Sequence, residues 1–348
     1  MQITVKTFTV HKRFPLTISR GTTAQTTNLW LKIESEGIEG WGEASPFSVI
    51  KGTSINPEKL QQELEKIIPT LEKFNPLQRQ QIETVLLENN LNSSLRAAID
   101  TALHDWLGKK VGLPLWKLWG LNCDCIVPTS VTISISSPEK AVERVKNWLN
   151  FMDAKLLKIK LGSPDGIEAD KAMIVAIREA TPHIPLTVDA NGGWNIKNAI
   201  YMSDWLATQN VKYIEQPLEV GDEGNLPQLY QRSHLPIFVD ESCFKSQDII
   251  KLSPYVHGIN IKLMKAGGLT EVMRVIAIAK ACKLQIMYGC YSDSSLANTA
   301  MCHLAPYADY LDLDSHFNLI DDPFQGVTLE EGKLMLNNLP GLGVKKLN

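Results

Sequence analysis

Short apolar runs that each end in a charged residue recur along the middle of the chain. They cover residues 156–160, 185–189, 211–215, 236–240 and 258–262, and they end at Lys160, Asp189, Glu215, Asp240 and Lys262. Runs of four or five residues rich in Val, Ile and Leu are typical of parallel strands buried on both faces. Segments with helical periodicity separate these runs. The pattern therefore predicts a repeated strand–helix unit.

The repeat extends in both directions to eight strands. We expect a first strand over 127–135, a seventh over 285–289 and an eighth over 310–314. The intervening helices are expected to begin at Ser137-Pro138 and then to lie near 165–181, 195–209, 222–233, 245–252, 268–282 and 293–306. This is an α/β architecture, a modified TIM barrel of the form (β/α)7β, and we assign it to residues 125–315.

A different pattern precedes the barrel. Strands are expected over 2–10 and 27–43, with a hairpin turn at 35–37 and polar loops at 19–23 and 46–53. Helices should begin at Asn56-Pro57 and after Asn92, which are residues that favour helix starts. The second helix carries a buried stripe, and His104 lies off it, so we expect His104 at the solvent or at the core edge. Residues 1–124 are predicted to form an α+β capping domain, with 316–348 packing back on it.

Three carboxylates end consecutive strands of the predicted barrel. Because the C-terminal ends of barrel strands open on one face, Asp189, Glu215 and Asp240 should converge there. An all-oxygen ligand set without thiolate or imidazole favours Mg²⁺ over zinc. The alternative is that each carboxylate pairs with a neighbouring lysine.

Lysines flank this predicted metal site. Lys158 and Lys160 lie two residues apart, so they share one strand face, and each ammonium should lower the pKa of the other. Lys262 ends a strand four places around the barrel and should face Lys160 across the opening. Two bases on opposite sides of one carbon can remove a proton from one face and return one to the other, which is epimerisation. Structural salt bridging is the alternative, above all for Lys158.

Composition excludes several classes of function. The 348 residues are 44% hydrophobic with a net charge of −3, so the core is large and no basic stripe indicates nucleic-acid binding. No run approaches a membrane span, and the first 30 residues lack a signal-peptide pattern. The six cysteines are scattered, and Cys123 and Cys125 form an incidental pair. We expect a cytoplasmic protein.

Several motifs resemble those of a known family. Lys158-Ile159-Lys160, Asp189-Ala190-Asn191, Glu215-Gln216-Pro217, Asp240-Glu241-Ser242, the 260–268 stretch and Gly40-Trp41-Gly42-Glu43 resemble the muconate-lactonising subgroup of the enolase superfamily. Enzymes of that superfamily combine a Lys or His base with Mg²⁺. The resemblance implies that loops 19–23 and 47–53 close over the barrel mouth and select the substrate.

The eighth strand narrows the resemblance. Asp312-Leu313-Asp314 resembles the Asp-x-Asp of dipeptide epimerases, where the pair binds the α-ammonium group of the substrate, and Thr132 matches a polar position of their first strand. The resemblance implies a Mg²⁺-dependent dipeptide epimerase that inverts the α-carbon of the C-terminal residue. Lys160 and Lys262 would transfer the protons through a metal-stabilised enediolate.

The substrate side chains are less well defined. Alanyl-glutamate epimerases carry Glu at the seventh strand end, where this chain has Tyr291-Ser292-Asp293. Arg20 corresponds to an Arg that pairs with the glutamate carboxylate in those enzymes, and Lys51 adds positive charge. Asp293 points instead to a cationic side chain. The balance favours an L-Ala-D/L-Glu-like dipeptide.

Other functions fit the same scaffold. N-acylamino-acid racemase, o-succinylbenzoate synthase and muconate cycloisomerase would use the metal and a lysine, but their substrates have no free ammonium for Asp312 and Asp314. A barrel that binds amino-acid-like ligands without catalysis is a further alternative. By analogy with related barrels we also expect a homo-oligomer, which light scattering would test.

Overall fold

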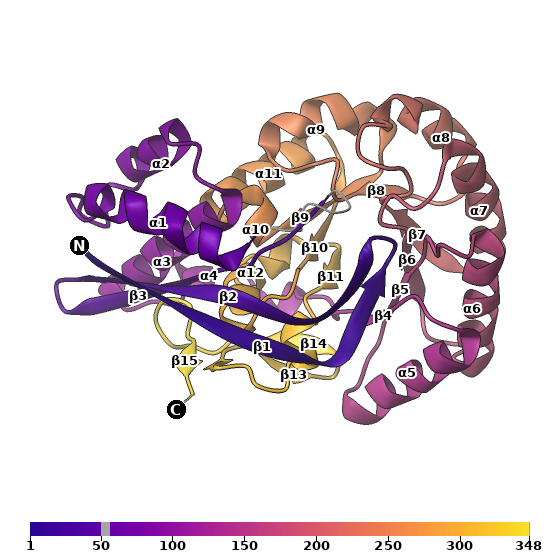
Figure 1. The fold of residues 1–348 in the computed structure, drawn as a ribbon, viewed down its shortest axis with the longest axis horizontal. Helices are drawn as coiled ribbons and strands as arrows, with labels where there is room; N and C mark the ends of the chain where they lie inside the picture. The colour runs from indigo at the N-terminus through magenta and orange to yellow at the C-terminus, as the bar shows by residue number, and fades with distance from the viewer. Residues whose placement is uncertain (50–55, 348) are drawn as a thin grey trace.

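The predicted strand–helix repeat forms one eight-stranded parallel sheet in chain order (Figure 1). The computed structural model describes residues 1–49 and 56–347. The strands are β4 Val131–Ile133, β5 Leu157–Lys160, β6 Leu186–Asp189, β7 Val211–Glu215, β8 Ile237–Val239, β9 Gly258–Lys262, β10 Gln285–Gly289 and β11 Tyr310–Asp312. Thr129 bridges to Leu311, which brings the two ends of the sheet together. The predicted barrel is therefore confirmed, although its first strand is shorter than 127–135.

Helices cover the outside of this barrel (Figure 1). They are α5 Pro138–Phe151, α6 Ile167–Ala180, α7 Ile196–Thr208, α8 Leu226–Arg232, α9 Ser246–Leu252, α10 Leu263–Ala266, α11 Leu269–Ala281 and α12 Ser295–Cys302, with 3₁₀ turns at 223–225, 253–255, 305–307 and 315–318. Ser137 accepts the backbone N–H of Lys140 at the start of α5, as its Ser-Pro sequence indicates. The short α10 was not foreseen from the sequence.

The N-terminal part combines an antiparallel sheet with helices. Its elements are β1 Gln2–Ile18, β2 Gly21–Ser35, β3 Ile38–Ala44, α1 Pro57–Leu71, α2 Arg79–Glu88, α3 Ser93–Val111, α4 Leu115–Leu118 and the turn 123–125. Asn56 and Asn92 cap α1 and α3 through their side-chain oxygens, as predicted. The hairpin turn falls at Glu36 and Gly37, both with positive φ. Helix α2 was not foreseen from the sequence.

Two expectations for this part are wrong. The segment expected to contain a loop at 19–23 is instead the far end of the β1–β2 hairpin, where only Ser19 and Arg20 form the turn. Its strands pair by backbone and by a Thr17–Thr22 hydroxyl contact of 2.9 Å, so they need no apolar alternation. His104 is fully buried. Its ring accepts a hydrogen bond from Arg79 and donates one to the Asp100 carbonyl, so both ring nitrogens have partners inside the protein.

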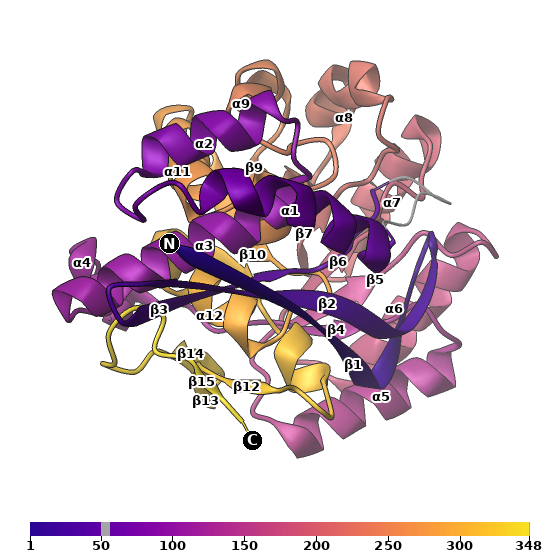
Figure 2. The ribbon, with the colours of Figure 1, turned by 60° about the vertical axis from the view of Figure 1, so that its left-hand side comes forward.

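The C-terminal segment lies against the N-terminal sheet (Figure 2). Its strands are β12 Phe324–Gln325, β13 Thr328–Glu330, β14 Lys333–Met335 and β15 Lys345–Lys346. The Phe324 ring packs 5.5 Å from that of Phe8, and the Leu342 N–H donates to Asp105 of α3. The exact domain boundaries at 124 and 315 stay predictions.

Two carboxylates of the capping domain cap helices of the barrel. Asp100 of α3 accepts the backbone N–H of Thr270 at 2.9 Å and its hydroxyl at 2.5 Å, at the first turn of α11. Glu43 of β3 accepts the N–H groups of Ser294 and Ala297 at 3.0 and 3.2 Å, at the start of α12. Both carboxylates thus accept backbone N–H groups at helix starts. At α11 this is needed because Gly268, the residue before the helix, has no side chain that could accept them.

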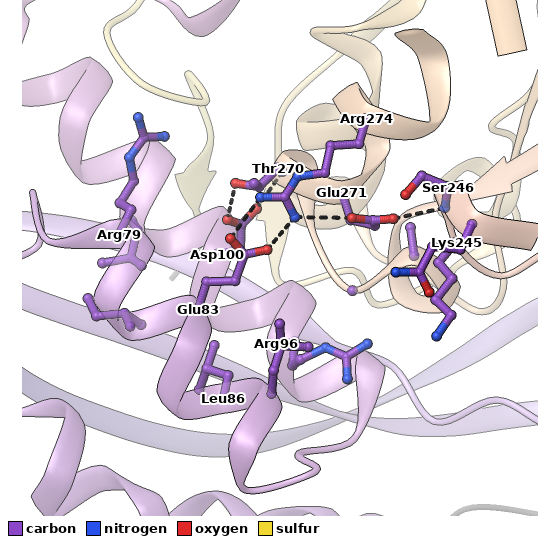
Figure 3. A pocket seen from close by; sticks show the side chains of 16 residues that line it. Arg79, Glu83, Leu86, Arg96, Asp100, Lys245, Ser246, Thr270, Glu271 and Arg274 are labelled. Atoms are coloured by element: carbon purple, nitrogen blue, oxygen red, sulfur yellow. Dashed lines mark hydrogen bonds and ion pairs between the residues drawn. The ribbon is translucent and has the colours of Figure 1, made fainter. Parts of the chain in front are cut away.

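Ion pairs reinforce the docking beside Asp100. Figure 3 shows the cleft between α2, α3 and helices α9 to α11, where Arg274 points toward Glu83 and Glu271. Arg274 of the barrel contacts both carboxylate oxygens of Glu83 from α2, one of them at 2.8 Å. The charged groups therefore tie the capping domain to the barrel well outside the barrel mouth.

Asp100→Ala is expected to destabilise the protein by about 1–2 kcal/mol, the usual cost of losing a helix cap. Burial opposes ionisation of Asp100, but His104 and Thr270 outweigh it and lower its pKa. A lowered folded-state pKa means that the contribution is present above the unfolded pKa and is lost as the pH falls through the folded one. Urea unfolding at neutral and acidic pH measures both effects.

The matched control is Asp204→Ala. This variant removes an exposed carboxylate that, among the described residues, pairs with His234 alone. An equal loss in both variants at neutral pH would contradict the capping role.

In the described part of the chain, no helix is long and apolar enough to cross a bilayer. All six cysteines are free thiols, including Cys123 and Cys125.

Candidate active site

The C-terminal ends of β5, β6, β7 and β11 meet around one buried ammonium group. Lys158 Nζ lies 2.7 Å from Glu215 Oε2, 2.7 Å from Asp312 Oδ2 and 3.3 Å from Asp189 Oδ2. The Lys158 side chain is 1% exposed. The parallel register places Lys160 beside Asp189, and Asp189 beside Glu215. The structure therefore brings these predicted residues together at one end of the barrel.

The other two lysines stand on opposite sides of this group. Lys160 Nζ lies 2.6 Å from Asp189 Oδ2, and Lys262 Nζ lies 2.6 Å from Asp240 Oδ2. Strands β5 and β9, which carry these lysines, are four places apart in the sheet. The lysines thus approach the carboxylates from two directions, as the strand spacing predicts.

The carboxylates suit a hard cation by their chemistry. Glu215 Oε2 and Asp240 Oδ2 are buried and accept no hydrogen bond of good geometry, although each contacts a lysine ammonium as an ion pair. Within the described residues, no three acidic, His or Cys side chains already converge closely enough to hold a metal. The ammonium groups between the carboxylates account for this. Asp189, Glu215 and Asp240 offer only oxygen, the donor that Mg²⁺ prefers.

Neighbouring charges shift the carboxyl groups in opposite directions. Burial and the Asp189 charge raise the pKa of Glu215 to about 7. Burial also opposes ionisation of Asp189 and Asp240, but Lys160 and Lys158 hold the pKa of Asp189 below its usual value, and Lys262 and Lys265 do the same for Asp240. Two of the three carboxylates are therefore firmly ionised by their lysine partners.

The expected lowering of the Lys158 pKa is wrong for this structure. Burial does lower it, but Asp312, Glu215 and Asp189 together outweigh burial and raise the pKa well above its ordinary value. Asp240 likewise outweighs burial at Lys262 and raises its pKa. The alternative for Lys158, salt bridging to carboxylates, is the arrangement in this structure, whereas the pKa prediction counted only the neighbouring ammonium at residue 160.

Asp312 and Asp314 lie beside this cluster, oriented by the first barrel strand. Thr132 donates its backbone N–H to Asp314 Oδ2 at 2.7 Å and its hydroxyl to Asp312 Oδ1 at 3.3 Å. Burial and the Asp312 charge raise the pKa of Asp314 to about 6, whereas Lys158 outweighs burial and lowers that of Asp312. Both aspartates line a pocket together with Lys160. The pair is placed to hold a cation.

Aromatic side chains form one wall beside Lys262. The Tyr291 ring centroid lies 4.4 Å from Lys262 Nζ, and the Phe47 ring stacks on Tyr291 at 4.5 Å. Phe244 follows, with its ring 6.3 Å from Phe47. The end of the seventh strand therefore presents an apolar surface to the barrel mouth.

The residues predicted to select the substrate side chain are engaged elsewhere. Arg20 Nη2 lies 2.7 Å from Glu241 Oε1, and its Nη1 donates to the Asn191 carbonyl. Asp293 is 2% exposed and accepts the Tyr291 N–H, and burial raises its pKa, so it is held inside the protein rather than at the mouth. Lys51 and the 50–53 part of the second predicted loop lie outside the described residues. Sequence position alone did not reveal the partners of Arg20 and Asp293.

Sequence reasoning also missed several polar residues at the site. Asn260 donates to Glu215 Oε1 at 2.7 Å, and Lys265 lies 2.7 Å from Asp240 Oδ1. Lys12 of β1 lines the same pocket as Asp312. Gln216 directly follows Glu215 and has φ of 36°, and Asn191 lies two positions after Asp189 and has φ of 45°. Non-glycine residues with positive φ concentrate at functional sites and were a usable signal only after the fold was known.

Comparison with known families agrees with this fold and site. Residues 2–120 match the N-terminal domain of the mandelate racemase / muconate lactonizing enzyme family, and residues 140–346 match the enolase C-terminal domain-like family. The chain therefore belongs to the enolase superfamily, which confirms the resemblance seen in its motifs.

Individual relatives are more specific. A hydrophobic dipeptide epimerase of a Flavobacteria bacterium (strain MS024-2A) is 44% identical over 99% of this chain and 97% of its own length. An L-Ala-D/L-Glu epimerase of Bacteroides thetaiotaomicron is 34% identical over 100% of this chain and 88% of its own. The crystal structure of an Enterococcus faecalis dipeptide epimerase complexed with Mg and L-Leu-L-Tyr is 33% identical, with a TM-score of 0.91 over 99% of this chain and 98% of that one.

Proposed function

We propose that this protein is a dipeptide epimerase that inverts the α-carbon of the C-terminal residue. The observation that carries the proposal is the placement of Lys160 and Lys262 on opposite sides of one carboxylate cluster, with Asp312 and Asp314 beside it. Relatives that cover almost the whole chain are dipeptide epimerases, which supports the same activity.

Each group has a defined task in this reaction. Asp312 and Asp314 accept the α-ammonium of the N-terminal residue, and Thr132 keeps the two carboxylates oriented. With the substrate so held, the α-carbon of the second residue lies between Lys160 and Lys262. The Asp240 charge that raises the pKa of Lys262 would be shared with a cation held by the same carboxylate, which would favour loss of the lysine proton. The neutral amine of one lysine takes the α-proton as the C–H bond breaks, and the ammonium of the other protonates the opposite face. The direction of reaction decides which lysine is the base.

Asp189, Glu215 and Asp240 would hold a divalent cation, for which Mg²⁺ fits best. When bound, such a cation supplies Lewis-acid stabilisation of negative charge on the substrate carboxylate. The residues of the chain then provide orientation and proton transfer, and the buried position of the cluster excludes water.

The C-terminal side chain of the substrate is expected to be apolar. Tyr291, Phe47 and Phe244 form the wall next to Lys262, and an aromatic wall favours burial of an apolar side chain. An acidic side chain would need a free cation, but Arg20 already pairs with Glu241. An L-Ala-D/L-Glu-like substrate stays a prediction that requires this ion pair to open.

Deuterium uptake from D₂O tests the proposal. Incubation with Mg²⁺ and a dipeptide library should place one deuteron at the α-carbon of the C-terminal residue and yield both epimers. L-Ala-L-Leu and L-Ala-L-Phe should react faster than L-Ala-L-Glu, because the wall beside Lys262 is apolar. Absence of exchange with every dipeptide would refute epimerase activity and revive a purely binding barrel. Faster reaction of L-Ala-L-Glu would refute only the apolar preference.

The rival reactions of this scaffold differ at the amino terminus. N-acylamino-acid racemase, o-succinylbenzoate synthase and muconate cycloisomerase act on compounds without a free ammonium. The free dipeptide L-Ala-L-Leu should therefore react in preference to N-acetyl-L-Ala-L-Leu, because the acetylated form leaves Asp312 and Asp314 without a cation. Preference for the acetylated compound would favour an N-acylamino-acid racemase instead.

A further inference from the structure

Lys12 is a buried lysine without a partner in the substrate pocket. Its residue is 8% exposed, and within the described residues no carboxylate lies within 4 Å of its Nζ and no group accepts a hydrogen bond from it. Burial lowers its pKa against the attraction of Cys290, Asp314 and Asp293. Most of the Lys12 side chain is removed from water while its ammonium has no partner, so this cation at the edge of a pocket requires an explanation.

A second unpaired cation lies along the same wall. Arg144 of α5 stacks on the Phe14 ring with its Cζ 4.0 Å from the centroid, and its buried Nε has no hydrogen-bond partner. Lys12, Phe14 and Leu16 line the pocket from alternate positions of β1, and Arg144 and Trp148 line it from adjacent turns of α5. The capping domain and the barrel thus each contribute one cation to this wall.

The charge balance of the pocket favours an anion there. The lining groups with charge are Lys12, Arg144, Lys160, Asp312 and Asp314. Lys160 is paired with Asp189. Once a substrate ammonium occupies the Asp312–Asp314 pair, Lys12 and Arg144 are the remaining lining charges without a counter-ion. A negative group near the ammonium would complete the balance.

We propose that Lys12 and Arg144 form an anion subsite for a carboxylate on the N-terminal residue of the substrate, so that the enzyme favours dipeptides that begin with Glu or Asp. The inference rests on the proposed function, because Asp312 and Asp314 must hold the α-ammonium of that residue. The side chain of an N-terminal Glu starts at the carbon that bears the ammonium, and Lys12 and Arg144 line the same pocket as the aspartate pair that would hold this ammonium.

A matched substrate pair tests this subsite. L-Glu-L-Leu and L-Gln-L-Leu have nearly the same shape and differ in one charge, so wild-type kcat/KM should favour the Glu compound by about tenfold, as for one charge-assisted pair. Lys12→Met should lower kcat/KM for L-Glu-L-Leu about tenfold more than for L-Gln-L-Leu and so abolish that preference, and its urea unfolding curve shows whether the variant is folded. Arg144→Met should reduce the preference in part. Arg13→Met removes the same charge from the opposite face of β1 and should leave the preference unchanged.

Three results would overturn the subsite. The first is equal turnover of the two compounds by wild type. The second is an equal loss of both in Lys12→Met, which would assign Lys12 to the peptide backbone common to all dipeptides. The third is faster reaction of N-succinyl-L-Leu than of L-Glu-L-Leu, which would assign the cations to an N-acyl carboxylate. The proposed function itself fails only if no dipeptide exchanges its α-proton, so the two failures are distinguishable.

Discussion

Lys160→Ala and Lys262→Ala should each abolish epimerisation, with a fall in kcat of at least about 10³-fold, the scale of a lost general acid or base. The lysines contact different carboxylates, Asp189 and Asp240, on strands four places apart, so neither can replace the other. Chiral chromatography of L-Ala-L-Leu incubated with Mg²⁺ measures the inversion.

The lysine that remains in each variant should still exchange the α-proton of one epimer, which tests the two-base assignment more directly than the loss of inversion. One variant should still exchange the α-proton of the LL epimer in D₂O without inversion, and the other should exchange only the LD epimer. Lys155→Ala, which removes an exposed lysine paired with Asp153, should behave as wild type. Normal inversion by either active-site variant would exclude the two-base assignment.

Lys158→Met is expected to have the largest effect on stability, a loss of about 3–5 kcal/mol in the metal-free protein, as for a broken buried ion pair. The substitution keeps most of the side-chain volume but leaves Asp189, Glu215 and Asp312 without the ammonium that all three contact. Urea unfolding of EDTA-treated protein at pH 7 measures the loss.

The loss in free energy of unfolding should be much larger for the buried Lys158 than for an exposed lysine. Lys155→Met is the control, because an exposed pair contributes about 1 kcal/mol or less. A loss of under 1 kcal/mol for Lys158→Met would show that the three carboxylates do not depend on Lys158. Mg²⁺ should restore part of the stability of Lys158→Met, because it would supply positive charge to Asp189 and Glu215, two of the three carboxylates that Lys158 contacts.

The barrel was predictable because its strands are short apolar runs, buried on both faces, that each end in a charged residue. Those features depend on local sequence, and the parallel register then places Lys160, Asp189 and Glu215 side by side. The far end of the β1–β2 hairpin was not predictable in this way, because one face of β1 packs against barrel residues distant in the sequence, as Phe14 does against Trp148, and the rest is held by pairing with β2.

Contacts between distant elements explain the remaining errors. Arg20 is separated by 221 positions from Glu241, and no local pattern shows that the two pair. Lys12 lies just beyond the strand expected over 2–10, and no local pattern shows that the barrel covers one side of it. The pKa direction of Lys158 was wrong for the same reason, because its carboxylate partners come from other strands.

The capping of α11 by Asp100 and of α12 by Glu43 limits how the two domains could be recombined. A barrel transplanted beneath a different capping domain, or produced alone, would lose the acceptor of the Thr270 N–H at the start of α11, which Gly268 cannot replace, and the acceptor of the Ala297 N–H in α12, where Ser294 and Asp322 accept the two preceding N–H groups. Domain chimaeras within this superfamily should therefore succeed only when the incoming domain carries an acidic side chain at both positions. The acidic residues at these two interface positions therefore restrict which capping domains a given barrel can accept.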